Sequence, residues 1–130
     1  MRKIIIYIAL AMGLFVANSA KAQSNFDQII TSLKSGDASS LAGYFEKSVE
    51  ITTKENESTY SKTQAEQVLS RFFSSHDPKS FTIVHQGTSP EGSKYVIGTL
   101  VTSSGTFRTY IYAKQNGSAL LIQQIRFEDQ

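Results

Sequence analysis

Residues 80–130 read SFTIVHQGTSPEGSKYVIGTLVTSSGTFRTYIYAKQNGSALLIQQIRFEDQ, and apolar side chains recur at every second position through most of this stretch. A period of two is typical of β-strands, whose side chains point alternately to opposite faces. The pattern predicts four strands, over residues 81–86, 95–102, 107–114 and 120–128. Turn residues separate the strands at Pro90-Glu91-Gly92, Ser104-Gly105 and Asn116-Gly117. Because the last two fit two-residue hairpins, we expect an antiparallel meander.

Two-residue turns at these sites set the register, so that Thr106 lies opposite Ser103 and Ser118 lies opposite Gln115. One face of the sheet then carries Phe81, Ile83, His85, Val96, Gly98, Leu100, Phe107, Thr109, Ile111, Leu120, Ile122, Gln124 and Arg126. The other face carries Val84, Tyr95, Ile97, Thr99, Val101, Arg108, Tyr110, Tyr112, Leu121, Gln123, Ile125 and Phe127. Neither face is polar enough to be left bare, and helices can cover only one. Either the second face meets a partner, most simply another copy of the chain, or twist and the N-terminal strands hide it.

Upstream of residue 80 the apolar spacing changes to that of amphipathic helices. The first helix is indicated by Phe26, Ile29, Ile30 and Leu33, between an N-cap at Ser24 and a stop at Gly36. Asp37 caps a short second helix whose apolar side is formed by Leu41, Tyr44 and Phe45. The third helix opens with a capping box from Ser61 to Gln64, ends before Pro78, and has an apolar side of Ala65, Val68, Leu69, Phe72 and Phe73.

Two short strands are expected between the second and third helices. Val49 and Ile51 alternate with polar residues, and Thr59 with Tyr60 indicates a return strand after the polar loop 54–58. The element order α-α-β-β-α-β-β-β-β makes the fold class α+β. About three helices are expected to pack on a curved antiparallel sheet of four to six strands.

The N-terminus has the layout of a signal peptide. Arg2 and Lys3 precede an uncharged run over residues 4–17, and Ala20 and Ala22 form the small-x-small pattern of a cleavage site. The run is shorter than the about 20 residues that a helix needs to cross a bilayer, which favours a signal peptide over the alternative, a retained membrane anchor. We therefore expect cleavage after Ala22, a periplasmic or secreted protein, and one mature domain over residues 23–130, with no membrane association after cleavage.

Composition narrows the classes of partner. The thirteen Lys and Arg fall to ten once Arg2, Lys3 and Lys21 are removed, against eleven Asp and Glu. No basic cluster remains to attract nucleic acid. The chain has no cysteine, so the fold depends on its core rather than on disulfides.

The element order resembles the nuclear transport factor 2-like (NTF2-like, also called cystatin-like) cone, in which a bent sheet wraps around helices. Within that superfamily the chain resembles the bacterial family called domain of unknown function 4783 (DUF4783). The resemblance rests on LKSGD (33–37), YSKTQAE (60–66), KSFTI (79–83), GTL (98–100), GTFR (105–108) and LIQQIR (121–126). It implies a small protein exported by a Gram-negative bacterium, and the family brings no activity to carry over.

The candidate ligand-binding residues are few. Thr99, Tyr110 and Gln123 are expected to form a polar row across three strands, with Arg108 beside it. Convergent polar groups in an apolar wall are typical of small-molecule pockets. The alternative is that the Tyr and Arg tips simply lie in water over apolar surface.

The two histidines give no metal signature. His76 and His85 lie nine residues apart without cysteines nearby, so neither a metal site nor a cofactor is expected. His76 fits the end of the third helix. His85 is a candidate ligand-binding residue or general acid–base, because enzymes of the resembled superfamily often use Asp, His or Tyr in the cone; the alternative is a surface histidine with a hydrogen bond.

Three function classes follow. The leading hypothesis is a non-enzymatic binding or interaction module, using a cone pocket for a small hydrophobic ligand or the uncovered sheet face for a protein partner. The alternative is a cone-fold enzyme with acid–base chemistry on a hydrophobic small molecule, which requires His85 or Tyr110 in a water-poor cavity with a second polar group within about 3 Å. A purely structural dimer requires a filled cone.

Overall fold

The computed structural model describes residues 26–54 and 56–130. The predicted signal peptide over residues 1–22 and the predicted N-cap Ser24 lie outside the described residues. Within the described part, no helix combines the length and apolar character needed to cross a membrane.

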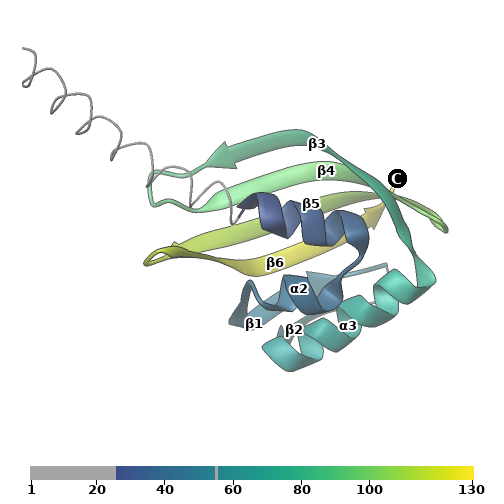
Figure 1. Ribbon diagram of the computed structural model, residues 1–130, viewed down its shortest axis with the longest axis horizontal. Coiled ribbons are helices and arrows are strands. Elements are labelled where there is room, and N and C mark those ends of the chain that lie inside the picture. The colour runs from purple at the N-terminus through teal and green to yellow at the C-terminus, as the bar shows by residue number, and fades with distance from the viewer. Residues whose placement is uncertain (1–25, 55) are drawn as a thin grey trace, which may run out of the picture.

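A six-stranded sheet forms the frame of the domain, with strand order β2-β1-β6-β5-β4-β3 (Figure 1). The strands are β1 (Phe45–Thr52), β2 (Glu57–Ser61), β3 (Pro78–Thr88), β4 (Lys94–Thr102), β5 (Gly105–Asn116) and β6 (Ala119–Asp129). β3 to β6 form the predicted antiparallel meander. The sheet is not antiparallel throughout, however, because β1 runs parallel to β6. This pairing is possible because α3 and the meander provide the long connection that parallel neighbours need.

The helices pack on one side of the sheet, as Figure 1 shows. The N-terminal helix is described over residues 26–35 and ends at Gly36, whose positive φ of 67° suits a residue without a Cβ. The short helix α2 (Ala38–Ala42) is capped by Asp37, and α3 (Lys62–Ser75) begins with the predicted capping box from Ser61 to Gln64.

The predicted second helix is too long. α2 ends at Ala42, and Phe45 opens β1 instead of completing an apolar helix side. The physical reason is that the Ile122 N–H donates to the Tyr44 carbonyl oxygen at 2.6 Å, which ties the chain to the sheet one residue before β1 begins.

The core lies between the helices and the sheet side that faces them, called here the inner face. The sheet contributes Phe81, Val96, Leu100, Phe107, Ile111, Ala113, Leu120, Ile122, Ile125 and Phe127, all buried. Ile29, Leu33, Leu41 and Leu69 meet them from the helices and are fully buried. Phe72 of α3 stacks on Phe127 with ring centroids 4.2 Å apart, which joins the end of the helix to the last strand.

Two β-bulges alter the predicted faces. In β6, Tyr112 lies opposite Gln124 while Ala113 lies opposite Ile122, so Gln123 is the extra residue. Beyond it the strand changes phase: Ile125 and Phe127 are buried on the inner face, and Gln124 and Arg126 are the residues that point away from the helices. The prediction placed these four residues on the opposite sides, because it assumed an unbroken period of two.

The second bulge lies in β3. Ile83 pairs with Gly98 and His85 pairs with Ile97, so Val84 is the extra residue. His85 therefore lies on the face away from the helices, whereas the prediction placed it on the same face as Val96. The bulge leaves Val84 62% exposed, on a strand at the edge of the sheet.

Both predicted hairpins are two-residue turns, but each is centred one residue away from its expected position. Thr102 pairs with Gly105 and Asn116 pairs with Ala119. The first turn is held by Ser104, whose N–H donates to Thr102 Oγ1 at 3.2 Å and whose hydroxyl donates to the Ser75 carbonyl at 2.7 Å. In both hairpins each residue pairs with a partner two positions away from the predicted one. Because side chains alternate with a period of two, this shift leaves every side chain on its predicted face.

Gly98 allows the Phe81 ring to cross the centre of β4. A Cβ at Gly98 would lie 2.3 Å from Phe81 Cζ and 2.7 Å from the Thr82 carbonyl oxygen. We predict that Gly98→Ala lowers the free energy of unfolding by ~1–3 kcal/mol, as overpacked cores do. In chemical denaturation, the double variant Gly98→Ala/Phe81→Leu should lose less than the sum of the two single variants. Additive losses would show that the Phe81 ring is not the obstacle.

Asp37 makes a small part of the stability depend on pH. Hydrogen bonds from the Ser40 N–H and the Ser40 hydroxyl hold the pKa of the Asp37 carboxyl below its usual range near ~4. A carboxyl whose pKa is lowered by folding contributes stability above its unfolded pKa and loses it as the pH falls through the folded value. Asp37→Ala should therefore be less stable than the parent at pH 7, with the difference shrinking below pH ~4 in thermal melts. A difference that stays constant across this range would contradict the assignment.

Candidate functional site

The sheet face that points away from the helices is called here the outer face. Its side chains include His85, Tyr95, Ile97, Thr99, Val101, Arg108, Tyr110, Tyr112, Gln124 and Arg126. Alternation along β4 and β5 produces this face, because Val96, Leu100, Phe107 and Ile111 turn inward. The outer face is thus built from the rigid centre of the meander.

Aromatic and aliphatic side chains gather on two neighbouring strands of this face. Tyr95 pairs with Tyr112 and Ile97 pairs with Tyr110, and these four residues are called here the tyrosine patch. Tyr95 is 38% and Tyr112 37% exposed, while Ile97 and Tyr110 are half-buried. Cross-strand pairs of this kind are stable neighbours, so the patch is a fixed surface.

His85 joins one corner of the tyrosine patch. Its Nε2 lies 3.0 Å from the Tyr95 hydroxyl, with the two rings tilted at 48°. Gly87 makes this contact possible, because a Cβ there would lie 2.5 Å from Cε1 of the Tyr95 ring. Gly87 lies just beyond the predicted strand 81–86, and the bulge at Val84 is needed to bring His85 and Tyr95 together.

Charged side chains border the patch in opposite pairs. The Arg126 guanidinium carbon lies 5.8 Å from the centroid of the Tyr110 ring, and Arg126 Nη1 lies 3.4 Å from Glu128 Oε1. Arg108 pairs in register with Thr99 on one side and Glu128 on the other. Gln124 Nε2 donates to Glu50 Oε1 at 3.4 Å across the parallel pair. These contacts are exposed or half-exposed, so they orient the side chains more than they stabilise the fold.

The structure brings together most, though not all, of the sequence-based site residues. Thr99, Arg108, Tyr110 and His85 share the outer face. Thr99 lies opposite Arg108 instead of Tyr110, however, and Gln123 leaves the predicted row because it is the bulge residue. Tyr95, the partner of His85, was not among the predicted site residues.

The predicted site residues do not line a common hollow. A hollow of about 350 Å³ lies beside them and is lined by residues of the N-terminal helix, β3 and β4: Phe26, Asp27, Gln86, Gly87, Thr88, Lys94 and Tyr95. Core side chains from the helices and from the inner face form one hydrophobic cluster. His85 has a second polar group at 3.0 Å, yet it is exposed, so the pair lacks the water-poor surroundings that acid–base catalysis requires. Among the described residues, no three His, Asp or Glu side chains come together to hold a metal ion. His76 instead closes α3 and stacks on Phe72 at 4.6 Å.

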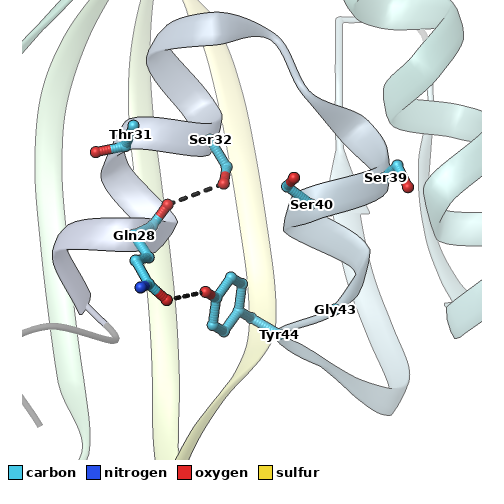
Figure 2. A pocket seen from close by; sticks show the side chains of 7 residues that line it. All are labelled: Gln28, Thr31, Ser32, Ser39, Ser40, Gly43 and Tyr44. Carbon is cyan, nitrogen blue, oxygen red and sulfur yellow. Dashed lines mark hydrogen bonds between the residues drawn. The ribbon is translucent and has the colours of Figure 1, made fainter. Parts of the chain in front are cut away.

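A separate hollow of about 660 Å³ opens on the helix side, between the N-terminal helix and the segment from α2 to the start of β1 (Figure 2). Its polar lining, with Gln28 and Tyr44 at one end, was not predicted from the sequence. Serine and threonine are frequent throughout the chain, so nothing in their spacing distinguishes this group.

Comparison with known proteins identifies relatives over nearly the whole described chain. The family model "Domain of unknown function (DUF4783)" matches residues 26–128. A DUF4783 family protein from Bacteroides uniformis, in a crystal structure, is 31% identical with a TM-score of 0.76, and the match covers 80% of this chain and 95% of that one. A DUF4783 family protein from Bacteroides ovatus is 31% identical with a TM-score of 0.75, covering 79% and 93%.

More distant structures share only the fold. An NTF-2 like protein of unknown function from Silicibacter pomeroyi is 10% identical with a TM-score of 0.60, covering 89% of this chain and 98% of that one. No curated protein matches the chain. The family match and the two Bacteroides structures confirm the family indicated by the sequence, and the distant match confirms the NTF2-like fold. The chain belongs to the DUF4783 family and has the NTF2-like fold.

Proposed function

We propose that this domain is an exported interaction module whose outer face binds a second copy of the same chain. The observation that carries the proposal is the tyrosine patch, a block of Tyr95, Ile97, Tyr110 and Tyr112 on the side of the sheet away from the helices. Tyrosine is enriched at protein interfaces because it combines a large apolar ring with a polar tip. The outer face is therefore a broad surface on which apolar rings and side chains gather.

The charges of the outer face favour a second copy over a strongly charged partner. Arg108, Lys114 and Arg126 are matched in number by Glu50, Glu57 and Glu128 on the same face. A two-fold dimer places the same surface on both sides, so a face of balanced charge does not repel itself. The same balance gives a polyanion such as nucleic acid nothing to bind.

The area of the face is sufficient for such a dimer. β3 to β6 are 9 to 12 residues long. At ~3.3 Å per residue and ~4.8 Å between strands, the four strands cover roughly 700 Å² in projection. Stable interfaces of standard size bury about 800 Å² of accessible surface per partner, and the accessible surface of a pleated sheet exceeds its projection.

Pairing through the sheet edges is disfavoured. β3 carries register shifts between Pro78 and Ser80 and between Ile83 and His85, and β2 at the other edge has five residues. Bulges and short strands are the usual means by which natural sheets prevent edge-to-edge addition. The faces, rather than the edges, are therefore the expected surfaces of contact.

A charge in the centre of the patch tests the dimer. Tyr112→Arg should shift the mature protein, residues 23–130, from dimer to monomer in sedimentation velocity at about 50–100 μM, because two copies would bring unpaired arginines into a desolvated centre. Thermal stability should change little, since Tyr112 is partly exposed in the monomer.

The matched control is Gln67→Arg, which adds the same charge on an exposed position of α3 and should leave the dimer intact. A parent protein that sediments as a monomer throughout the range would refute the proposal. So would a Tyr112→Arg protein that remains dimeric.

Export rests on the N-terminal sequence. Arg2 and Lys3, the uncharged run and the Ala20-Lys21-Ala22 site predict removal of residues 1–22. The mass of the protein recovered from a periplasmic extract of a Gram-negative host should therefore correspond to a chain that begins at Gln23. Protein found with Met1 intact would contradict both the cleavage and the proposed location.

A further inference from the structure

A second surface lies on the other side of the domain. The groove shown in Figure 2 runs between the N-terminal helix, which contributes Gln28, Thr31 and Ser32, and the segment that contributes Ser40 and Tyr44. It has a volume of about 660 Å³, within the range of ligand sites, and it opens to solvent. Because it lies on the helix side, a dimer formed through the outer face leaves it free.

We propose that this groove is a binding site for a neutral sugar. The first argument is the kind of polar atom that it presents. The Thr31 and Ser32 hydroxyls donate to the carbonyl oxygens of Asp27 and Gln28, each at 2.9 Å. Once a hydroxyl has donated its proton, its oxygen still has lone pairs that accept. These two hydroxyl oxygens are therefore acceptors for hydroxyl groups of a ligand.

Gln28 supplies the complementary donor. The Tyr44 hydroxyl donates to Gln28 Oε1, which fixes the orientation of the side-chain amide (Figure 2). Within the described residues, no hydrogen bond engages Gln28 Nε2, so this part of the chain leaves both of its protons to a ligand. A ligand with hydroxyl groups can accept from this amide and donate to the neighbouring oxygens, which a ligand with acceptors alone cannot do.

The lining also excludes other classes of ligand. Among the described residues, all of the side chains that line the groove are uncharged, so this part of the chain offers no cation to a phosphate or carboxylate there. Asp37 lies next to Ser40, but its carboxylate is engaged by the Ser40 N–H and hydroxyl at 3.0 and 2.7 Å. The Tyr44 ring is the one large apolar surface of the lining, which is too little for a hydrophobic ligand and suits the apolar side of one sugar ring.

The site is held in place before any ligand arrives. The Tyr44 carbonyl oxygen accepts from the Ile122 N–H at 2.6 Å, and the Tyr44 N–H donates to the Leu41 carbonyl oxygen at 2.9 Å. The Tyr44 ring packs against the core. A preorganised aromatic ring and amide reduce the entropy lost on binding.

The test is a titration followed by amide resonances in two-dimensional NMR, with glucose, galactose, mannose and N-acetylglucosamine as probes at up to ~50 mM, which detects millimolar binding. At least one sugar should produce saturable shifts confined to residues 28–32 and 39–44. Gln28→Ala should weaken that binding about tenfold or more, since it removes the donor and the partner of Tyr44. The control Gln67→Ala, on exposed α3 surface, should bind as the parent does.

Three results would overturn the proposal. One is the absence of saturable shifts with every sugar of the panel; another is saturable shifts that map elsewhere on the domain. The third is a Gln28→Ala protein that binds as tightly as the parent while keeping the parent's spectrum outside the groove.

Discussion

The side chains that form the core must all lie on the side of the sheet that the helices cover. β6 meets this constraint with one extra residue, Gln123, which lets Ile122 and Ile125 both face inward. Without that bulge Phe127 would face solvent, and its 4.2 Å stack with Phe72 would be lost, at a cost comparable to the ~3–5 kcal/mol of a buried Phe→Ala change. The same phase change places Arg126 on the outer face, beside Tyr110.

The two bulges determine which side chains of β3 and β6 point to each face of the sheet, and the two faces therefore differ in chemistry. The inner face and the helices form the hydrophobic core. The outer face carries tyrosines between balanced charges, and the groove on the helix side carries oriented polar atoms around a single aromatic ring. The proposed dimer surface and the proposed sugar site lie on opposite sides of the domain, so binding at one does not block the other.

Local patterns in the sequence predict most of the fold. The capping box at Ser61, the stop at Gly36 and the alternation in β4 and β5 depend on near neighbours, and the structure confirms them. The parallel pairing of β1 with β6 depends on contacts between distant segments, which a local pattern does not contain. The sequence does contain a sign of the bulge at Gln123, because Ile122 and Ile125 are three residues apart instead of two. The prediction kept a period of two through this segment and therefore assigned Gln124 and Arg126 to the wrong face. For the site, the alternation placed Thr99, Arg108 and Tyr110 on one face, whereas the contacts of His85 and Arg126 depend on the bulges.

The central claim is that the outer face is the surface through which two copies meet. The most direct measurement is an isotope-filtered nuclear Overhauser experiment on a mixture of labelled and unlabelled chains, which detects only contacts between copies. We expect intermolecular contacts from the rings of Tyr95 and Tyr112 and the methyl groups of Ile97 and Val101, all on the outer face. Intermolecular contacts from the helices or from Val84 at the β3 edge, with none from the tyrosine patch, would contradict the account.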